Sequence, residues 1–293
     1  MKFDMKETSI FKKTIDWINS KHLIRLALLT GSFTDGSTTD EFSDLDISLF
    51  CSDPQQLTDC NSWLKDIDNV WVVIPEKYRL LGASIPTRLV IFKGGKKVDF
   101  SFFSLDQLKV LEREGLPDAF NIGYEVLVDK DHLGSKLPSP EFVGFREPKP
   151  SKEDFHHLIK EFWFEVYHVA KYLYRQDLWS VQFRFSGIYH KILIKMVCWN
   201  EAGKNQWDYS THSLGKRLDN WVGKDTWNTI RNIFPHFDAE EGWIALREMT
   251  KLFKRLSHET SKTLGYDNLL VLEGEMRQFI TKLENKSRKD NSV

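Results

Sequence analysis

The sequence has few of the features that mark secreted, membrane-spanning or nucleic-acid-binding proteins. Its 293 residues include only three cysteines, an odd number without metal-ligand spacing, so we expect free thiols in a reducing compartment. No apolar run reaches the roughly 18 residues of a membrane span. The first residues, MKFDMKETS, lack the apolar core of a signal peptide, which predicts a cytoplasmic protein. The net charge of −1 and the lack of a long basic tract argue against nucleic-acid or membrane partners.

Two different patterns of apolar residues follow one another along the chain. The first part alternates short apolar strands with helices, which predicts a mixed β-sheet with flanking helices. Here we expect helices at 8–20, 54–67 and 106–114, and strands at 23–29, 42–50, 70–74, 88–103 (a hairpin) and 124–128. Beyond residue 152 we expect long aromatic-rich helices at 154–175, 179–201, 212–221, 224–233, 239–264 and 268–286. The fold class is therefore predicted to be α+β.

The length and the change of pattern predict two domains. We expect a sheet domain over residues 1–135 and an all-α helical bundle over 153–286. Between them, residues 136–152 read as a linker, because four prolines interrupt the periodicity there. Residues 287–293 are predicted to be a disordered tail.

The first two strands carry the most informative residues. Gly31-Ser32 forms a turn after the first strand, and Asp44 and Asp46 belong to the second strand. Because strand side chains alternate, the two carboxylates share one face, where they would repel each other without a cation. Hard oxygen ligands of this kind suit Mg²⁺, and the backbone N–H groups of a Gly-Ser turn suit a phosphate. Each motif alone is weak, since Asp-x-Asp also occurs on solvated strands.

A third carboxylate strengthens this prediction. Asp99 interrupts an apolar strand that returns from the hairpin turn Lys93–Lys96, where an unpaired acid would be costly. If its strand neighbours that of Asp44 and Asp46, the three carboxylates converge and could hold two Mg²⁺ ions. A salt bridge from Asp99 to Lys96 or Lys97 is the alternative.

These residues together resemble the nucleotidyltransferase superfamily, and the chain is more closely similar to the aminoglycoside 6-adenylyltransferases, the streptomycin-modifying enzymes. The resemblance extends through most of the chain, with blocks at Glu161-Phe-Trp163, Val169-Ala-Lys171 with Arg175, and Ser213-Leu-Gly215-Lys216. Phe33 stands where the streptomycin enzymes would have arginine, a difference that bears on the acceptor.

The resemblance implies how the first domain would bind its substrates. It implies a small nucleotidyltransferase core that binds ATP and Mg²⁺. Asp44, Asp46 and Asp99 would hold the metal and act in catalysis, and Gly31 and Ser32 would contact the ATP phosphates.

The resemblance also assigns residues of the helical domain. It implies that the 154–175 helix lines a cleft between the domains, where Glu161 is our first candidate for the base that deprotonates the acceptor. Glu165 and Glu41 are alternatives, and a solvated helix face is the ordinary explanation of such acids. Lys171 and Lys216 would neutralise the triphosphate, although a solvated helix lysine explains Lys216 equally well.

We therefore predict Mg²⁺-dependent transfer of AMP from ATP to a hydroxyl of a cationic aminoglycoside, with release of pyrophosphate. One alternative is a nucleotidyltransferase that acts on another small molecule or on a protein hydroxyl. A second alternative is a non-catalytic nucleotide-binding or toxin–antitoxin protein on the same fold. We expect a monomer or a weak homodimer.

Overall fold

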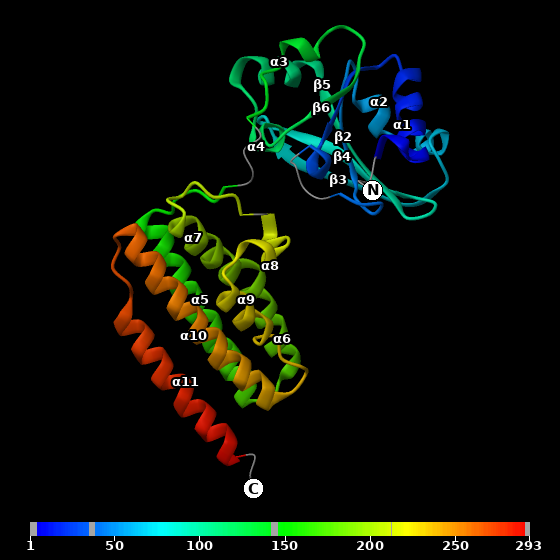
Figure 1. Cartoon of the computed structure of the whole chain (residues 1–293). Coiled ribbons are helices and arrows are strands. Elements are labelled where there is room, and N and C mark those ends of the chain that lie inside the picture. Colours follow the sequence, from blue (N-terminus) through cyan, green and yellow to red (C-terminus); the bar gives the residue numbers. More distant parts are fainter. Residues whose placement is uncertain (1–4, 35–38, 142–145, 212, 291–293) are drawn as a thin grey trace. The chain divides into compact units, whose positions relative to one another are not determined.

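The structure, a computed structural model, describes residues 5–34, 39–141, 146–211 and 213–290 (Figure 1). The chain divides into two compact units, residues 1–144 and 145–293, and each is described by itself. The first unit contains the β-sheet and the second is helical. The predicted α+β class is confirmed.

Six strands form one mixed sheet in the described part of the first unit, in the order β3-β4-β5-β2-β1-β6. Their bounds are β1 (Ile24–Thr30), β2 (Leu45–Cys51), β3 (Val70–Leu80), β4 (Ala83–Phe92), β5 (Lys96–Ser104) and β6 (Glu125–Asp129). β2 and β5 pair in parallel, and the other neighbours are antiparallel. The parallel pair at the centre of the sheet brings the Asp46 strand beside the Asp99 strand.

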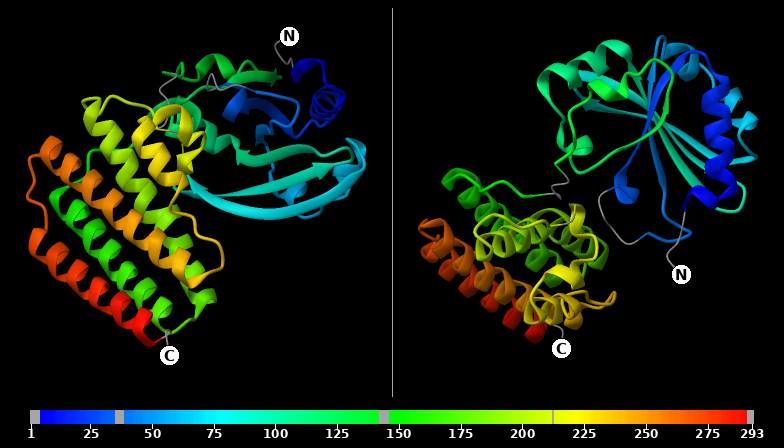
Figure 2. Two further views of the ribbon diagram at one scale, coloured as in Figure 1. Left: turned by 60° about the horizontal axis from the view of Figure 1, so that its bottom comes forward. Right: turned by 45° about the horizontal axis from the view of Figure 1, so that its top comes forward.

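Helices cover both faces of this sheet (Figure 2). They are α1 (Ser9–Ser20), α2 (Gln55–Thr58), α3 (Leu105–Glu114) and α4 (Asp118–Asn121). On the α1 side, Trp17 stacks on Trp63 with ring centroids 4.4 Å apart. On the α3 and α4 side, Phe50 stacks on Phe103 at 5.0 Å. These two apolar layers fix which residues of each strand face which side.

Two predicted elements beside the sheet differ from the observed ones. The helix expected at 54–67 consists of α2 and a separate 3-10 turn, Ser62–Asp66. The break lets Trp63 enter the core, where its indole N–H donates to the Leu57 carbonyl at 2.8 Å. The strand expected at 70–74 extends to Leu80, because β4 continues to pair with it beyond Pro75. Proline is tolerated there because β3 is an edge strand.

The second unit is a bundle of helices around one aromatic core. Its helices are α5 (Lys152–Tyr174), α6 (Leu178–Gly187), α7 (Ile194–Lys204), α8 (Leu218–Trp221), α9 (Lys224–Arg231), α10 (Ala239–Leu264) and α11 (Leu270–Asp290). A π-helical segment, Ile188–Leu193, joins α6 to α7, so the predicted 179–201 helix is continuous but locally widened. Between α5 and α10, Phe162 stacks on Phe253 with ring centroids 3.6 Å apart.

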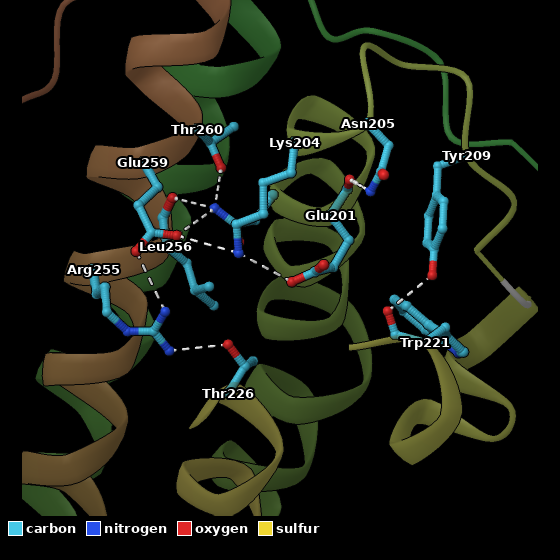
Figure 3. Close-up of polar contacts among 11 residues, drawn as sticks. Glu201, Lys204, Asn205, Tyr209, Trp221, Thr226, Arg255, Leu256, Glu259 and Thr260 are labelled. Atoms are coloured by element: carbon cyan, nitrogen blue, oxygen red, sulfur yellow. Dashed lines mark hydrogen bonds and ion pairs between the residues drawn. The ribbon is translucent and has the colours of Figure 1, made fainter. Parts of the chain in front are cut away.

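A chain of polar contacts links α7, α9 and α10 on one side of this bundle (Figure 3). Lys204 forms ion pairs with Glu201 at 3.2 Å and with Glu259 at 3.4 Å. Glu259 also pairs with Arg255 at 3.4 Å, and Arg255 donates to the Thr226 hydroxyl at 3.0 Å. These contacts connect helices that are distant in sequence, and so they help to fix the bundle.

Two predictions for the second unit are corrected. The helix expected at 212–221 is limited to α8, preceded by a short 3-10 turn, Ser213–Gly215, and residue 212 lies outside the described residues. Leu214, Gly215 and Arg217 have positive φ angles, which interrupt a right-handed helix.

The second correction concerns the tail. Residues 287–290, expected to be disordered, continue α11, and residues 291–293 lie outside the described residues. The helix persists because Ser287 is buried and Arg288 pairs with Glu240 and Glu284.

Candidate active site

Asp46 and Asp99 lie directly opposite each other on neighbouring strands. In the parallel β2–β5 pair, Asp46 is in register with Asp99, and on the other side Thr30 of β1 is opposite Asp46. The flanking residues Leu45, Ile47 and Val98 face the α1 side of the sheet, where they are buried. This alternation turns both carboxylates to the other face. The convergence inferred from the sequence is thus present for these two aspartates.

Lys97 connects the third carboxylate to this pair. Asp44 directly precedes β2 rather than belonging to it. The Lys97 ammonium lies 2.6 Å from Asp44 Oδ2 and 2.8 Å from Asp99 Oδ2. The salt bridge that the sequence offered as the alternative for Asp99 is therefore observed. A cation already separates two of the three predicted metal ligands.

The titration behaviour of this cluster reflects burial and charge together. Burial raises the pKa of Asp99, and the hydrogen bond from Lys97 only partly offsets that effect. The negative charges of Asp44 and Glu76 raise the same pKa further. Burial alone would lower the pKa of Lys97, but its hydrogen bonds to the two aspartates outweigh burial and raise it. Lys97 is therefore a firmly held cation at neutral pH.

The Gly31-Ser32 turn packs closely against Asp46. Gly31 has a φ of +75°, and a Cβ atom there would lie 2.1 Å from Asp46 Oδ2. Only glycine fits both constraints. Ser32 follows in a 3-10 turn, Gly31–Phe33, and the turn is held by Thr34, which donates from its hydroxyl to the carbonyls of Gly31 and Gly123. The predicted phosphate-binding turn is thus beside a predicted metal ligand.

A pocket of about 380 Å³ opens on this face of the sheet. Asp46, Asp99 and Gly31 line it together. Its apolar side is formed by Ala119, Phe120 and Ile122, around α4. Its polar side is formed by Ser48, Glu76, Tyr78, Thr87 and Ser101. The pocket lies wholly within the first unit.

The carboxylates of this pocket supply only part of a Mg²⁺ coordination sphere. In the described part of the chain, no group of three His, Cys, Asp or Glu side chains is arranged to hold a metal ion. However, Asp99 Oδ1 is buried and has no hydrogen-bond partner there. A buried carboxylate oxygen without a partner is costly, and a metal would satisfy it. The oxygen donors of Asp46 and Asp99 are therefore of the kind that fits Mg²⁺, whereas Asp44 is paired with Lys97.

The other predicted site residues lie in the second unit. Glu161 is exposed on α5, and Glu165, one turn later, pairs with Arg184 at 3.1 Å. The Lys171 ammonium lies over the rings of Tyr167 and Tyr172, at 5.5 and 5.0 Å from their centroids. These local contacts do not test the catalytic roles, which stay predictions.

The remaining predicted residues are on the surface. Lys216 is exposed, and its carbonyl accepts a hydrogen bond from the Trp221 indole at 2.9 Å. Glu41, the other candidate base, is exposed in the first unit. Their roles also stay predictions.

Sequence reasoning missed the polar side of the pocket. Glu76 and Tyr78 lie on the part of β3 that was not predicted as strand, and Thr87 lies on β4. The i, i+2 spacing of Glu76 and Tyr78 would have placed them on one face, had the strand been predicted to pass Pro75. Their proximity to Asp99 depends on strand register, which the sequence alone does not supply.

The fold and the site define a nucleotidyltransferase: a mixed sheet sets a Gly-Ser turn and paired strand aspartates around one pocket. The chain belongs to the streptomycin adenylyltransferase family, whose sequence profile matches residues 5–283. This confirms the family predicted from the sequence.

Individual relatives match over nearly the whole chain. An aminoglycoside 6-adenylyltransferase of Staphylococcus aureus is 24% identical over 94% of this chain and 97% of its own length. One of Campylobacter jejuni is 24% identical over 89% of this chain and 90% of its own. The crystal structure of an aminoglycoside 6-adenyltransferase from Bacillus subtilis aligns with a TM-score of 0.45 and 18% identity, covering 95% of this chain and 99% of that one. In the described part of this chain, no helix is both long and apolar enough to cross a bilayer.

Proposed function

We propose that this protein transfers AMP from ATP to a hydroxyl of a cationic aminoglycoside, in a Mg²⁺-dependent reaction that releases pyrophosphate. The observation that carries the proposal is the Asp46–Asp99 pair beside the Gly31 turn, in one pocket of a streptomycin adenylyltransferase family member. The names of the relatives support an aminoglycoside as the acceptor.

In the proposed reaction, an acceptor hydroxyl oxygen forms a bond to the α-phosphorus of ATP. The bond from that phosphorus to the α–β bridging oxygen breaks, and pyrophosphate leaves. The hydroxyl proton goes to a carboxylate base, for which Glu161 is the first candidate. AMP then remains as a phosphodiester on the acceptor.

The protein would contribute mainly position and charge. Gly31 and Ser32 would bind the phosphates, and Lys171 and Lys216 would balance the charge on the leaving pyrophosphate. Asp44, Asp46 and Asp99 would hold Mg²⁺, which supplies positive charge to the triphosphate when bound. Lys97 would then leave the carboxylates and become available to a phosphate oxygen.

The test is pyrophosphate release from Mg·ATP by the purified protein with a panel of aminoglycosides that includes streptomycin. We expect pyrophosphate, and an acceptor product that mass spectrometry shows to be heavier by one adenylyl group. Asp46→Asn should abolish turnover while leaving the circular dichroism spectrum unchanged. Asp106→Asn, at an exposed site on α3, is the matched control that should keep activity.

Other outcomes would favour the alternatives. ATP binding without any adenylylated aminoglycoside would point to another hydroxyl acceptor or to a non-catalytic nucleotide-binding role. Activity that persists after Asp46→Asn, or without divalent metal, would overturn the metal assignment. Sedimentation of the purified chain would test the expected monomer or weak homodimer.

A further inference from the structure

A row of polar side chains crosses four strands on the pocket face of the sheet, next to the catalytic carboxylates. Ser48 of β2 is in register with Ser101 of β5. Ser101 is in register with Thr87 of β4, and Thr87 is in register with Glu76 of β3. Ser48 and Ser101 lie two residues beyond Asp46 and Asp99 on the same strands. All four side chains line the same pocket.

The Thr87 hydroxyl has no partner in this row. The residue is only 5% exposed, and its Oγ1 atom is buried without a hydrogen bond to any part of the chain that the structure describes. Leaving a buried hydroxyl unpaired costs about 1–3 kcal/mol. Asp99 Oδ1, which lines the same pocket, is also buried and unpaired. A ligand in the pocket would satisfy both atoms after a rotation of each side chain, since neither atom is open to water in this arrangement.

Ser101, in contrast to Thr87, has a hydrogen-bond partner in the structure. The Tyr78 hydroxyl donates to Ser101 Oγ at 3.2 Å, which joins the edge strand to the central strand β5. The Tyr78 ring therefore extends across β4 toward β5, and it lies on the same face of β3 as Glu76, two residues before it. A flat wall next to a carboxylate suits a ring-shaped polar ligand.

Glu76 gives this side of the pocket its charge. It is exposed and forms no ion pair or hydrogen bond with another described residue, whereas Asp44 and Asp99 both form ion pairs with Lys97. A negative pocket edge repels a triphosphate and attracts a cation. This side of the pocket therefore favours binding of a cationic acceptor over binding of the nucleotide.

We propose that Glu76 and Thr87 form the acceptor subsite, with Glu76 binding an ammonium or guanidinium group and Thr87 a neighbouring ring hydroxyl. The proposal rests on the proposed function and names the part of the pocket that selects a cationic acceptor. Tyr78 and Ser101 position the ligand between this subsite and the Asp46–Asp99 pair. No covalent step involves Glu76.

The experiment compares steady-state kinetics of the wild-type chain, Glu76→Gln and Thr87→Val, with streptomycin as the acceptor. Glu76→Gln should raise the KM for streptomycin about ten- to a hundredfold, and leave the KM for Mg·ATP within about twofold. Thr87→Val should raise the same KM less, and Thr87→Ser should restore it. Glu114→Gln, the same chemical change at an exposed site on α3, should alter neither KM.

Calorimetric titration of streptomycin into each protein, with a non-hydrolysable ATP analogue present, separates this proposal from the proposed function. Weaker streptomycin binding by Glu76→Gln supports the subsite even if the wild-type chain proves unable to transfer AMP. An unchanged streptomycin affinity in Glu76→Gln overturns the subsite, even if adenylyl transfer is observed. If the substitution raised the KM for ATP and not the KM for streptomycin, the acceptor subsite would also be overturned, because the polar row would then bind the nucleotide. Wild-type protein that does not bind streptomycin at all overturns it too.

Discussion

Lys97 separates two carboxylates that would otherwise repel each other. It lies two residues before Asp99 on β5, and its ammonium contacts both Asp44 and Asp99. Two acids and one base leave a net negative charge, to which Asp46 adds. A divalent cation would balance this charge better than one ammonium group does. Lys97 thus holds Asp44 and Asp99 together, in the place that the proposed function gives to Mg²⁺.

The substitution Lys97→Met tests this role. Without metal, the variant should have a lower Tm than the wild-type chain, because Asp44 and Asp99 then repel each other across a partly buried site. Mg²⁺ should raise its Tm more than it raises that of the wild-type chain, because no ammonium competes for the carboxylates. Thermal unfolding with EDTA and with Mg²⁺ measures both effects. An equal Mg²⁺ effect on the two proteins would show that Lys97 does not compete with the metal. Lys12→Met, at an exposed ion pair on α1, is the control.

At Gly31, a single additional Cβ atom would disturb the geometry of the site. In Gly31→Ala, the new Cβ would collide with the Asp46 carboxylate, so we expect kcat to fall about a hundredfold because the reacting groups are displaced. Gly82→Ala is a matched control, because its φ of +70° imposes similar backbone strain with no atom within 4 Å of the new Cβ. It should cost about 1 kcal/mol of stability and little activity. If both variants lost activity equally, backbone strain rather than the collision would be responsible.

Helix α11 is held against α10 by ion pairs of two buried glutamates. Glu284 is 6% exposed and accepts from Arg247 of α10 and, at 3.2 Å, from Arg288 of its own helix. Near the other end of α11, the equally buried Glu273 contacts Lys254 at 2.5 Å and His258 at 3.0 Å. Ionic contacts at both ends thus hold a helix whose own apolar face is weak, since Ile280 is its only buried large apolar residue among those described.

Glu284→Ala should therefore lower the stability of the helical unit. We expect a loss of about 1–3 kcal/mol, less than for a fully buried pair because the two arginines remain partly exposed. Urea unfolding followed by circular dichroism gives this value. Glu275→Ala, at an exposed position of the same helix, should change it by less than about 0.5 kcal/mol. A loss of the same size in both variants would mean that helix propensity, not the ion pairs, was measured.

Elements were predictable where a strong local pattern agreed with the packing. The helix expected at 239–264 is α10, because Asp238 caps its start and Gly265, in the left-handed conformation, ends it. The strand after Pro75 and the break within 54–67 were missed, because cross-strand pairing with β4 and burial of Trp63 decide them. In the site, a costly acid in an apolar strand pointed to Asp99. The proposed roles of Thr87 and Glu76 depend on the pairing register of β3, β4 and β5, which the sequence alone does not show.

The two units of the molecule have separate hydrophobic cores. One apolar cluster of the first unit packs against α1 and another against α3 and α4, while a third lies within the helical unit. The buried aromatic rings are divided among these clusters, which accounts for much of the high content of 21 phenylalanines and 10 tryptophans. A unit with its own core can fold alone.

Fragments 1–144 and 145–293 should each show cooperative thermal unfolding. The first carries Gly31, Asp46 and Asp99 and should bind Mg·ATP, because the proposed metal ligands and the proposed phosphate-binding turn lie within it. It should not transfer AMP by itself, because the proposed base Glu161 and the proposed lysines belong to the second fragment. Calorimetric titration with ATP and the pyrophosphate assay, applied to each fragment and to their mixture, measure these properties. Adenylyl transfer by fragment 1–144 alone would remove Glu161 from the mechanism and leave Glu41, the alternative base that lies in this fragment, as the candidate.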